Sequence, residues 1–440
     1  MIFKKIKNYI KVKKNSSVDT GLSSICYFST SSSALGHHFF IKKFIKKNYN
    51  LKFVYFYIKQ IFSISKAFNI RVEKKKNYFR FKKIFITWGF KKDFDKNGNI
   101  IDQYFRISSK NKSVLWLVLY FDKNLPKKIS DNIILISNLH TSKKINIFSS
   151  FYYFFKSLHT KNFKIEKIFH ETAYTSHLAE NILNKIIDYL DINYVEKIFT
   201  PYEGQPFQHY IASKFKEINK KIKFYGYVSH NLPHSFDMIL RQGSPDFLFL
   251  QSEDQKKYLI KNLGWNSKKI KLIHSLRFKK TNKKKLINKI YFPNQISDMN
   301  NLVNNFQYYL STCKNFSIPK MKINTHPRAY NSEHQLKLKK KFMEIIRKYK
   351  KKFNNNKKNI SIVVGLTASP IYLLAHQIKV IHIVEDNFFQ SYSSKYWPSI
   401  NSKKINNFIY EYSLLKNKEI IKIKNKSSNF CLLYTSPSPR

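Results

Sequence analysis

Residues 200–207 (TPYEGQPF) hold a carboxylate, Glu203, in a polar loop that we expect between a strand and a helix. A carboxylate in such a loop can take the proton from an attacking hydroxyl. The other interpretation is that Glu203 only caps the helix that begins near Pro206, because a helix N-terminus favours negative charge. Local chemistry alone favours the cap, and both interpretations stay open.

Residues 322–328 (KINTHPR) place His326 at the end of an expected strand, with a rigid exit at Pro327 and a cation at Arg328. An imidazole and a guanidinium in this position suit a phosphate group or a departing nucleotide. The alternative is a histidine that only satisfies local hydrogen bonds.

Residues 363–370 (VVGLTASP) form a third polar group. Gly365 follows an expected strand, and the hydroxyls of Thr367 and Ser369 lie at an expected helix start. Together with free backbone N–H groups they would hold an anion. The alternative is an ordinary helix cap at Ser369, with Pro370 in the first turn.

A fourth group, residues 93–99 (DFDKNGN), is similar to a metal-binding Asp-x-Asp motif and to the start of a calcium loop. The twelfth position of such a loop needs a glutamate and is Tyr104 here. Asn97 and Gly98 are a strong hairpin-turn signal. We therefore predict a turn at this position and assign no metal.

From about residue 165 onward, short apolar runs alternate with amphipathic segments, which predicts an α/β fold with mainly parallel sheets. Earlier, only strands at 84–87 and 114–121 are clear, and their order is not. Ser252 and Gln255 predict a capping box for a helix that Gly264 ends. The strands expected in the later part are 197–200, 223–228, 247–250, 270–273, 290–293, 321–325, 360–364 and 380–384, and the helices are 206–216, 253–261, 297–313, 342–349 and 370–377.

This pattern predicts two Rossmann-like domains, residues 1–276 and 289–430, joined by a Lys- and Asn-rich linker at 277–288. A ligand is expected between them, at the carboxyl ends of the strands. Residues 431–440 (CLLYTSPSPR) have a different composition and resemble the translation of a sequencing adapter. We expect them to be an artefact and the second domain to be truncated.

The chain has 81 Lys and Arg residues against 26 Asp and Glu, a net charge of +55. Only 8 of the cations are arginine, the residue that nucleic-acid readers prefer, so nucleic-acid binding is the minor alternative. Three cysteines without a CxxC pair indicate a reducing compartment. We expect a cytoplasmic protein whose basic surface docks on the anionic inner face of the membrane.

The order of Tyr202-Glu203-Gly204, His326-Pro327 and Thr367-Ala-Ser369 resembles that of GT-B glycosyltransferases of bacterial surface carbohydrate biosynthesis, of the sialyltransferase and Kdo-transferase type. Tyr202 stands where those families carry an acidic residue. A broader likeness to surface-carbohydrate biosynthesis proteins rests on residues 88–90, 102–105, 115–117, 201–207, 245–246 and 263–265.

The resemblance implies two facing Rossmann-like domains and metal-independent, inverting transfer of a CMP-activated acid sugar onto a lipopolysaccharide or capsule acceptor. It implies no cofactor beyond the nucleotide-sugar donor. Glu203 would assist the acceptor hydroxyl and His326 would stabilise the leaving phosphate. The implied substrate-binding residues are Tyr202, Gly204, His230, Pro327, Arg328, Gly365, Thr367 and Ser369, with His234 beside His230 as a further histidine of the same loop. Transfer from a nucleotide-diphosphate sugar or a CDP-polyol is the alternative on the same fold.

Overall fold

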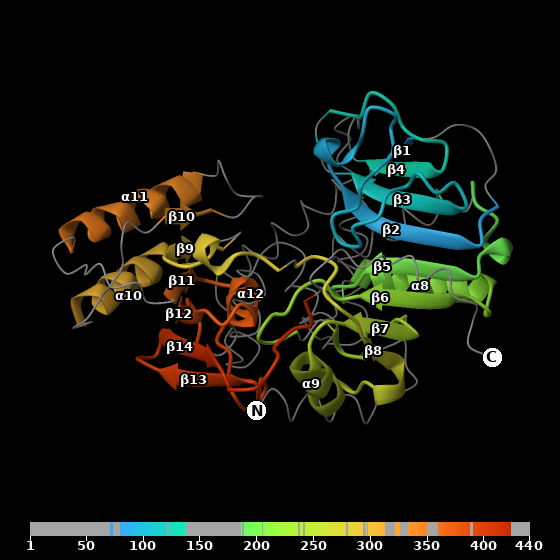
Figure 1. Ribbon diagram of the computed structural model, residues 1–440. Helices are drawn as coiled ribbons and strands as arrows, with labels where there is room; N and C mark the ends of the chain where they lie inside the picture. The colour runs from blue at the N-terminus through green and yellow to red at the C-terminus, as the bar shows by residue number, and fades with distance from the viewer. Residues whose placement is uncertain are drawn as a thin grey trace, which may run out of the picture.

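The computed structural model contains two β-sheets and the helices that cover them (Figure 1). It describes residues 71–73, 80–120, 122, 124–137, 186, 189–204, 206–235, 238–240, 243–278, 280–293, 296, 298–312, 322–325, 333–349, 360–387 and 390–423. The α/β class predicted from the sequence is confirmed. None of the described helices is long and apolar enough to cross a membrane.

The first sheet has eight strands in the order β1-β4-β3-β2-β5-β6-β7-β8. All neighbours are parallel except β1, which runs antiparallel to β4. β1, the first described strand along the chain, forms one edge of the sheet. From β2 the chain builds outward to β4, then returns beside β2 as β5 and builds outward to β8. The bounds are β1 (Arg71–Glu73), β2 (Lys83–Gly89), β3 (Val114–Tyr120), β4 (Ile133–Ser137), β5 (Lys197–Pro201), β6 (Lys223–Tyr227), β7 (Phe247–Leu250) and β8 (Ile270–Leu272).

The central strands of this sheet are apolar because both of their faces are covered. Every residue of β3 is buried. On one face α8 (Pro206–Ile218) packs on the aliphatic residues of β2, β3 and β5. The helix α9 (Glu253–Leu263) begins at the predicted Ser252 cap, which accepts a hydrogen bond from the Gln255 N–H, and it ends at Gly264, which adopts a left-handed φ of 80°. The reciprocal half of the predicted capping box is wrong, because the Gln255 side chain donates to the His230 carbonyl oxygen (3.1 Å) and its Oε1 has no partner among the described residues.

The other face carries aromatic side chains and is covered by residues 90–113, which connect β2 to β3. Within this segment the Gly98 N–H donates to the Asp95 carbonyl oxygen (3.0 Å), so the predicted turn is confirmed. Asp102 is buried and accepts hydrogen bonds from the Thr87 hydroxyl and the Tyr104 N–H. Burial raises the pKa of the Asp102 carboxyl to about 6.

The second sheet has six strands in the order β10-β9-β11-β12-β14-β13. The four strands predicted from the sequence are parallel, and an unpredicted antiparallel pair, β14 and β13, extends the sheet beside β12. The bounds are β9 (Lys289–Tyr291), β10 (Lys322–Asn324), β11 (Ile360–Val364), β12 (Lys379–Ile383), β13 (Ile400–Lys404), β14 (Ile409–Leu414), α10 (Met299–Thr312), α11 (Glu333–Lys348) and α12 (Ser369–Ala375). Short 3-10 turns lie at η1 (Lys91–Asp93), η2 (Ile192–Tyr194), η4 (Ser267–Lys269) and η5 (Lys283–Lys285).

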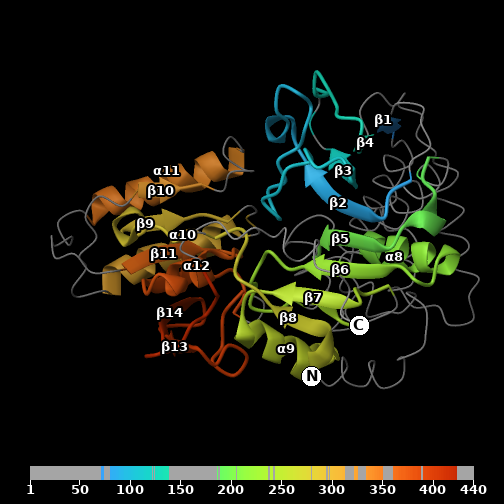
Figure 2. The same cartoon turned by 45° about the vertical axis from the view of Figure 1, so that its right-hand side comes forward.

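The two sheets meet through the segments that follow β6, β7 and β12. The hydroxyl of Tyr392 donates to the Asn231 carbonyl oxygen (2.7 Å), and the Trp397 indole N–H donates to the Pro233 carbonyl oxygen (3.0 Å). The Ser399 N–H and hydroxyl donate to the Asp254 carboxylate (2.9 and 3.1 Å). In Figure 1, α12 lies on the side of the second sheet that faces the first, and in Figure 2 it is seen across β11 and β12.

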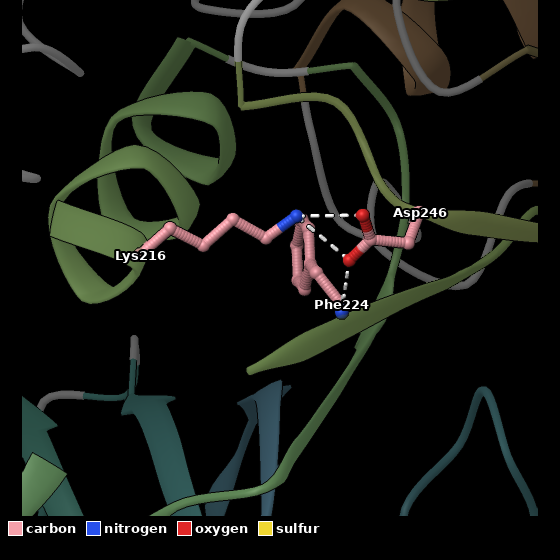
Figure 3. A network of polar contacts seen from close by, with 3 residues as sticks. All are labelled: Lys216, Phe224 and Asp246. Atoms are coloured by element: carbon pink, nitrogen blue, oxygen red, sulfur yellow. Dashed lines mark hydrogen bonds and ion pairs between the residues drawn. The ribbon is translucent and has the colours of Figure 1, made fainter. Parts of the chain in front are cut away.

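At the amino end of the first sheet, Asp246 joins a helix to a strand (Figure 3). Its carboxylate accepts from Lys216 Nζ on α8 (2.7 Å) and from the Phe224 N–H at the start of β6 (2.8 Å). Because one carboxylate satisfies both groups, it fixes α8 relative to β6. This edge lies opposite the carboxyl ends of the strands, so the network is structural.

We therefore expect Asp246→Ala to lower the free energy of unfolding by about 2 kcal/mol, since it removes a charge-assisted pair and leaves the Phe224 N–H without an acceptor. Urea denaturation followed by circular dichroism measures this change. Glu217→Ala is the matched control, because it breaks only an exposed ion pair with Lys214 (2.7 Å) and should cost less than about 0.5 kcal/mol. Equal effects of the two variants would contradict the structural role of Asp246.

Candidate functional site

The strand order of the first sheet reverses between β2 and β5. The connections that leave these two strands diverge, which makes their carboxyl ends the usual ligand position of an open parallel sheet. Glu203 and Gly204 lie here, directly after β5. Gly204 has a φ of 73°, a left-handed conformation that glycine adopts without strain.

Gln208, in the first turns of α8, fixes the loop that carries Glu203. Its side-chain Oε1 accepts from the Glu203 N–H (3.1 Å), and its Nε2 donates to the Pro201 carbonyl oxygen (2.7 Å). Gln208 is itself buried, so these hydrogen bonds are shielded from water. Glu203 is partly exposed at the end of the strand.

Tyr202, a predicted substrate contact, is fully buried. Its hydroxyl lies 3.1 Å from His209 Nε2, and its ring meets the edge of Trp265. The side chain thus packs between β5, α8 and the end of α9. This placement gives Tyr202 a structural role and gives no support to a contact with substrate.

His230 and Glu203 lie on neighbouring loops at the same end of the sheet, because Pro201 at the end of β5 is paired in register with Tyr227 at the end of β6. Burial lowers the pKa of the His230 imidazole, while the Glu203 carboxylate acts in the opposite direction and Arg277 adds to the lowering. His230 is therefore neutral near pH 7. Among the described residues, its Nδ1 has no hydrogen-bond partner.

Other buried polar atoms without a described partner lie on the same loop and on the neighbouring strand and helix. Asn231 is fully buried, and neither atom of its side-chain amide is hydrogen-bonded to a described residue. Such atoms are rare in folded proteins, and a ligand or water often satisfies them. The other members of the group are Ser235 Oγ, Gln251 Oε1 and Gln255 Oε1. Sequence reasoning identified His230 and His234 of this loop but assigned no role to Asn231 or Arg277.

The third sequence group lies at the corresponding position of the second sheet, whose strand order reverses between β9 and β11. Gly365 follows β11 with a φ of 65°, and a Cβ there would lie 2.8 Å from Cγ of Pro293, which follows β9. The hydroxyls of Thr367 and Ser369 are 3.0 Å apart. The alternative of a cap at Ser369 is wrong, because the N-cap residue of α12 is Ala368 and makes no side-chain cap.

His382, which sequence reasoning missed, lies on β12 and fixes the loop that contains Gly365. It is fully buried on β12, and its Nε2–H donates to the Gly365 carbonyl oxygen (2.8 Å). The rings of Tyr392 and Tyr412 lie beside it. Burial lowers the pKa of His382 to about 4, so the imidazole is neutral at physiological pH. A histidine within an apolar strand was the available signal.

The second sequence group lies outside the described residues. His326, Pro327 and Arg328 follow β10, which is described only to the residue after its end. Residues 431–440 also lie outside the described part. Within the described ranges, no group of three or more His, Cys, Asp or Glu side chains is arranged to hold a metal ion.

Comparison of the chain with known protein families and with curated proteins gave no match. The geometry of the two strand-order reversals therefore carries the functional argument.

We expect His382 to make the stability of the chain depend on pH. Between pH 6.5 and about 4 the unfolded chain binds a proton at this residue and the folded chain does not, so the free energy of unfolding falls as the pH falls. His382→Gln keeps an N–H donor but cannot titrate. When the pH falls from 7 to 4.5, the free energy of unfolding of this variant should therefore decrease by about 2 kcal/mol less than that of the wild type. Urea denaturation at each pH measures the difference.

His334→Gln on α11 is the matched control, because that side chain is exposed. It should leave the pH dependence of stability as in the wild type. If His382→Gln also behaves as the wild type, His382 is not held neutral by the fold.

Proposed function

We propose that the chain is a glycosyltransferase that moves a sugar from a nucleotide donor to an acceptor hydroxyl, with its two sheets as the two Rossmann-like domains of a GT-B arrangement. One observation carries the proposal. The carboxyl ends at each strand-order reversal hold one of the polar groups picked out from the sequence, Glu203 in the first sheet and Thr367 with Ser369 in the second. The contacts between Tyr392 and Asn231 and between Trp397 and Pro233 support the view that these two ends face each other.

In this proposal the acceptor hydroxyl loses its proton and its oxygen forms a bond to the anomeric carbon of the donor sugar. The bond from that carbon to the phosphate oxygen breaks, and the electron pair leaves with the nucleotide. Negative charge develops on the phosphate, where the hydroxyls of Thr367 and Ser369 are hydrogen-bond donors held in place before the reaction. Glu203 favours removal of the proton at the acceptor side.

The order of the sequence motifs supports a narrower version of the proposal. The donor is then a CMP-activated acid sugar, and His326 stabilises the leaving phosphate. The acceptor is a lipid-linked or oligosaccharide precursor of a surface polysaccharide at the inner face of the membrane, where a basic protein surface favours docking.

The purified chain should release nucleotide from one donor class when CMP-, UDP-, GDP- and CDP-activated compounds are offered with a mixture of acceptors. We expect Glu203→Gln to lower kcat about 100-fold, because the carboxylate no longer assists proton removal. Glu217→Gln, an exposed change on α8, is the control and should keep full turnover. Release only from a diphosphate donor would refute the CMP-sugar version, and full turnover by Glu203→Gln would refute the role of Glu203.

The hydroxyl pair makes a separate prediction. Thr367→Val and Ser369→Ala should each raise KM for the donor about tenfold, because each variant removes a hydrogen bond to an anionic group. Isothermal titration with the free nucleotide checks the same loss without turnover. Unchanged affinity in both variants would place the phosphate elsewhere.

A further inference from the structure

We propose that His230 is the proton acceptor of this site and that Glu203 stabilises the protonated imidazole. The inference rests on the proposed transferase function and deepens it. It changes the role of Glu203 from base to electrostatic partner, and it makes His230 the residue that contacts the reacting hydroxyl.

The fold holds the backbone around His230 from three directions. The Tyr202 N–H donates to the Tyr227 carbonyl oxygen (2.7 Å), which ties the loop after β5 to the end of β6. Gln255 Nε2 on α9 donates to the His230 carbonyl oxygen (3.1 Å). The Tyr392 hydroxyl holds the next carbonyl, that of Asn231. A backbone held at these points is in place before the substrate arrives.

The charged groups that act on His230 come from two directions and oppose each other. Glu203, after β5, favours the imidazolium form, while Arg277, after β8, favours the neutral form together with burial. The Leu276 N–H donates to the Tyr227 hydroxyl (3.1 Å), which ties the backbone next to Arg277 to a side chain of β6. From α9 and from the segment after β12 the neighbours are Gln255 and Tyr392, which are uncharged at neutral pH.

This balance is what a general base needs. Before reaction the imidazole is neutral and can accept a proton, and when it becomes cationic the Glu203 carboxylate on the neighbouring loop favours the new charge. Imidazole is also the side chain whose ordinary pKa lies nearest to the working pH, where proton transfer is most efficient. His230 is only partly buried, and its Nδ1 is enclosed by protein without a described hydrogen-bond partner. In this proposal Nε2 accepts the proton.

The proton therefore passes from the acceptor hydroxyl to His230 Nε2 as the oxygen bonds to the anomeric carbon. The bond between that carbon and the phosphate breaks, and the nucleotide leaves with the electron pair. The imidazolium then gives its proton to water. Buried Asn231, whose amide has no described partner, offers both a donor and an acceptor to a second hydroxyl beside the first.

The closing experiment measures kcat/KM against pH for the wild-type chain, His230→Gln, Glu203→Gln and Arg277→Gln, with the donor found in the screen. The wild type should lose activity on the acid side as His230 becomes protonated. His230→Gln should lower kcat about 100-fold or more and abolish this acid limb, with nucleotide affinity within twofold of the wild type. Glu203→Gln should move the limb to lower pH, and Arg277→Gln to higher pH.

His334→Gln, an exposed histidine change on α11, is the control and should keep both the rate and the limb. Turnover by His230→Gln within threefold of the wild type, or an acid limb that survives this change, would overturn the inference while leaving the transferase function in place.

If no donor is turned over by the wild type, the proposed function fails and the catalytic role fails with it. A titration of histidine C2–H signals by NMR then tests the arrangement alone. A His230 pKa that falls in Glu203→Gln supports the pairing of the two residues, and an unchanged pKa overturns it.

Discussion

The parallel pairing of β2 with β5 is the constraint on which the first half of the molecule depends. Ile84 and Phe85 lie opposite Ile198 and Phe199 in this pair. The two phenylalanine rings stack at 4.8 Å on one face of the sheet, and the isoleucines enter the aliphatic core on the other. Burial of both faces stabilises the pair. The pair brings together the carboxyl ends of β2 and β5, from which the chain continues in different directions. The position of Glu203 follows from this arrangement.

The second sheet reaches a similar geometry by a different interaction. Its order reverses between β9 and β11, and there Gly365 lies so close to Pro293 that no side chain would fit. The loop is then fixed by one buried hydrogen bond from His382. The ring of this histidine also lies beside that of Tyr392, whose hydroxyl donates to the Asn231 carbonyl oxygen. Tyr392 therefore connects the phosphate-binding loop proposed in one sheet to the loop of the other sheet that carries His230.

The sequence predicted the elements whose signals are local. The cap at Ser252, the left-handed Gly264 and the apolar run of β11 each act within a few residues, and each is confirmed. It did not predict β13, because this edge strand (INSKK) buries only its first residue and has no alternating pattern. Strand β4 was missed for a different reason, since a five-residue apolar run does not distinguish a strand from part of a buried helix.

The site was predictable only where scarce residues mark it. Gly204 and Gly365 stand out in a chain with 9 glycines, and both have positive φ. Arg277 and His382 depend on contacts between distant segments, which no local pattern encodes. Tyr202 was assigned to the site because it stands where the similar families carry an acidic residue. The side chains of consecutive residues in an extended segment point to opposite sides, and that of Tyr202 enters the core.

The net charge of +55 gives the proposed pairing of His230 and Glu203 a further physical reason. A chain with so large an excess of cations disfavours one more positive charge, and salt weakens this effect at exposed positions more than at buried ones. A histidine that becomes cationic during the reaction therefore needs a carboxylate of its own nearby. Arg277 sharpens that need, because it opposes protonation from the other side. In the proposed mechanism Glu203 supplies this carboxylate, at the edge of the sheet where β5 and β6 end side by side.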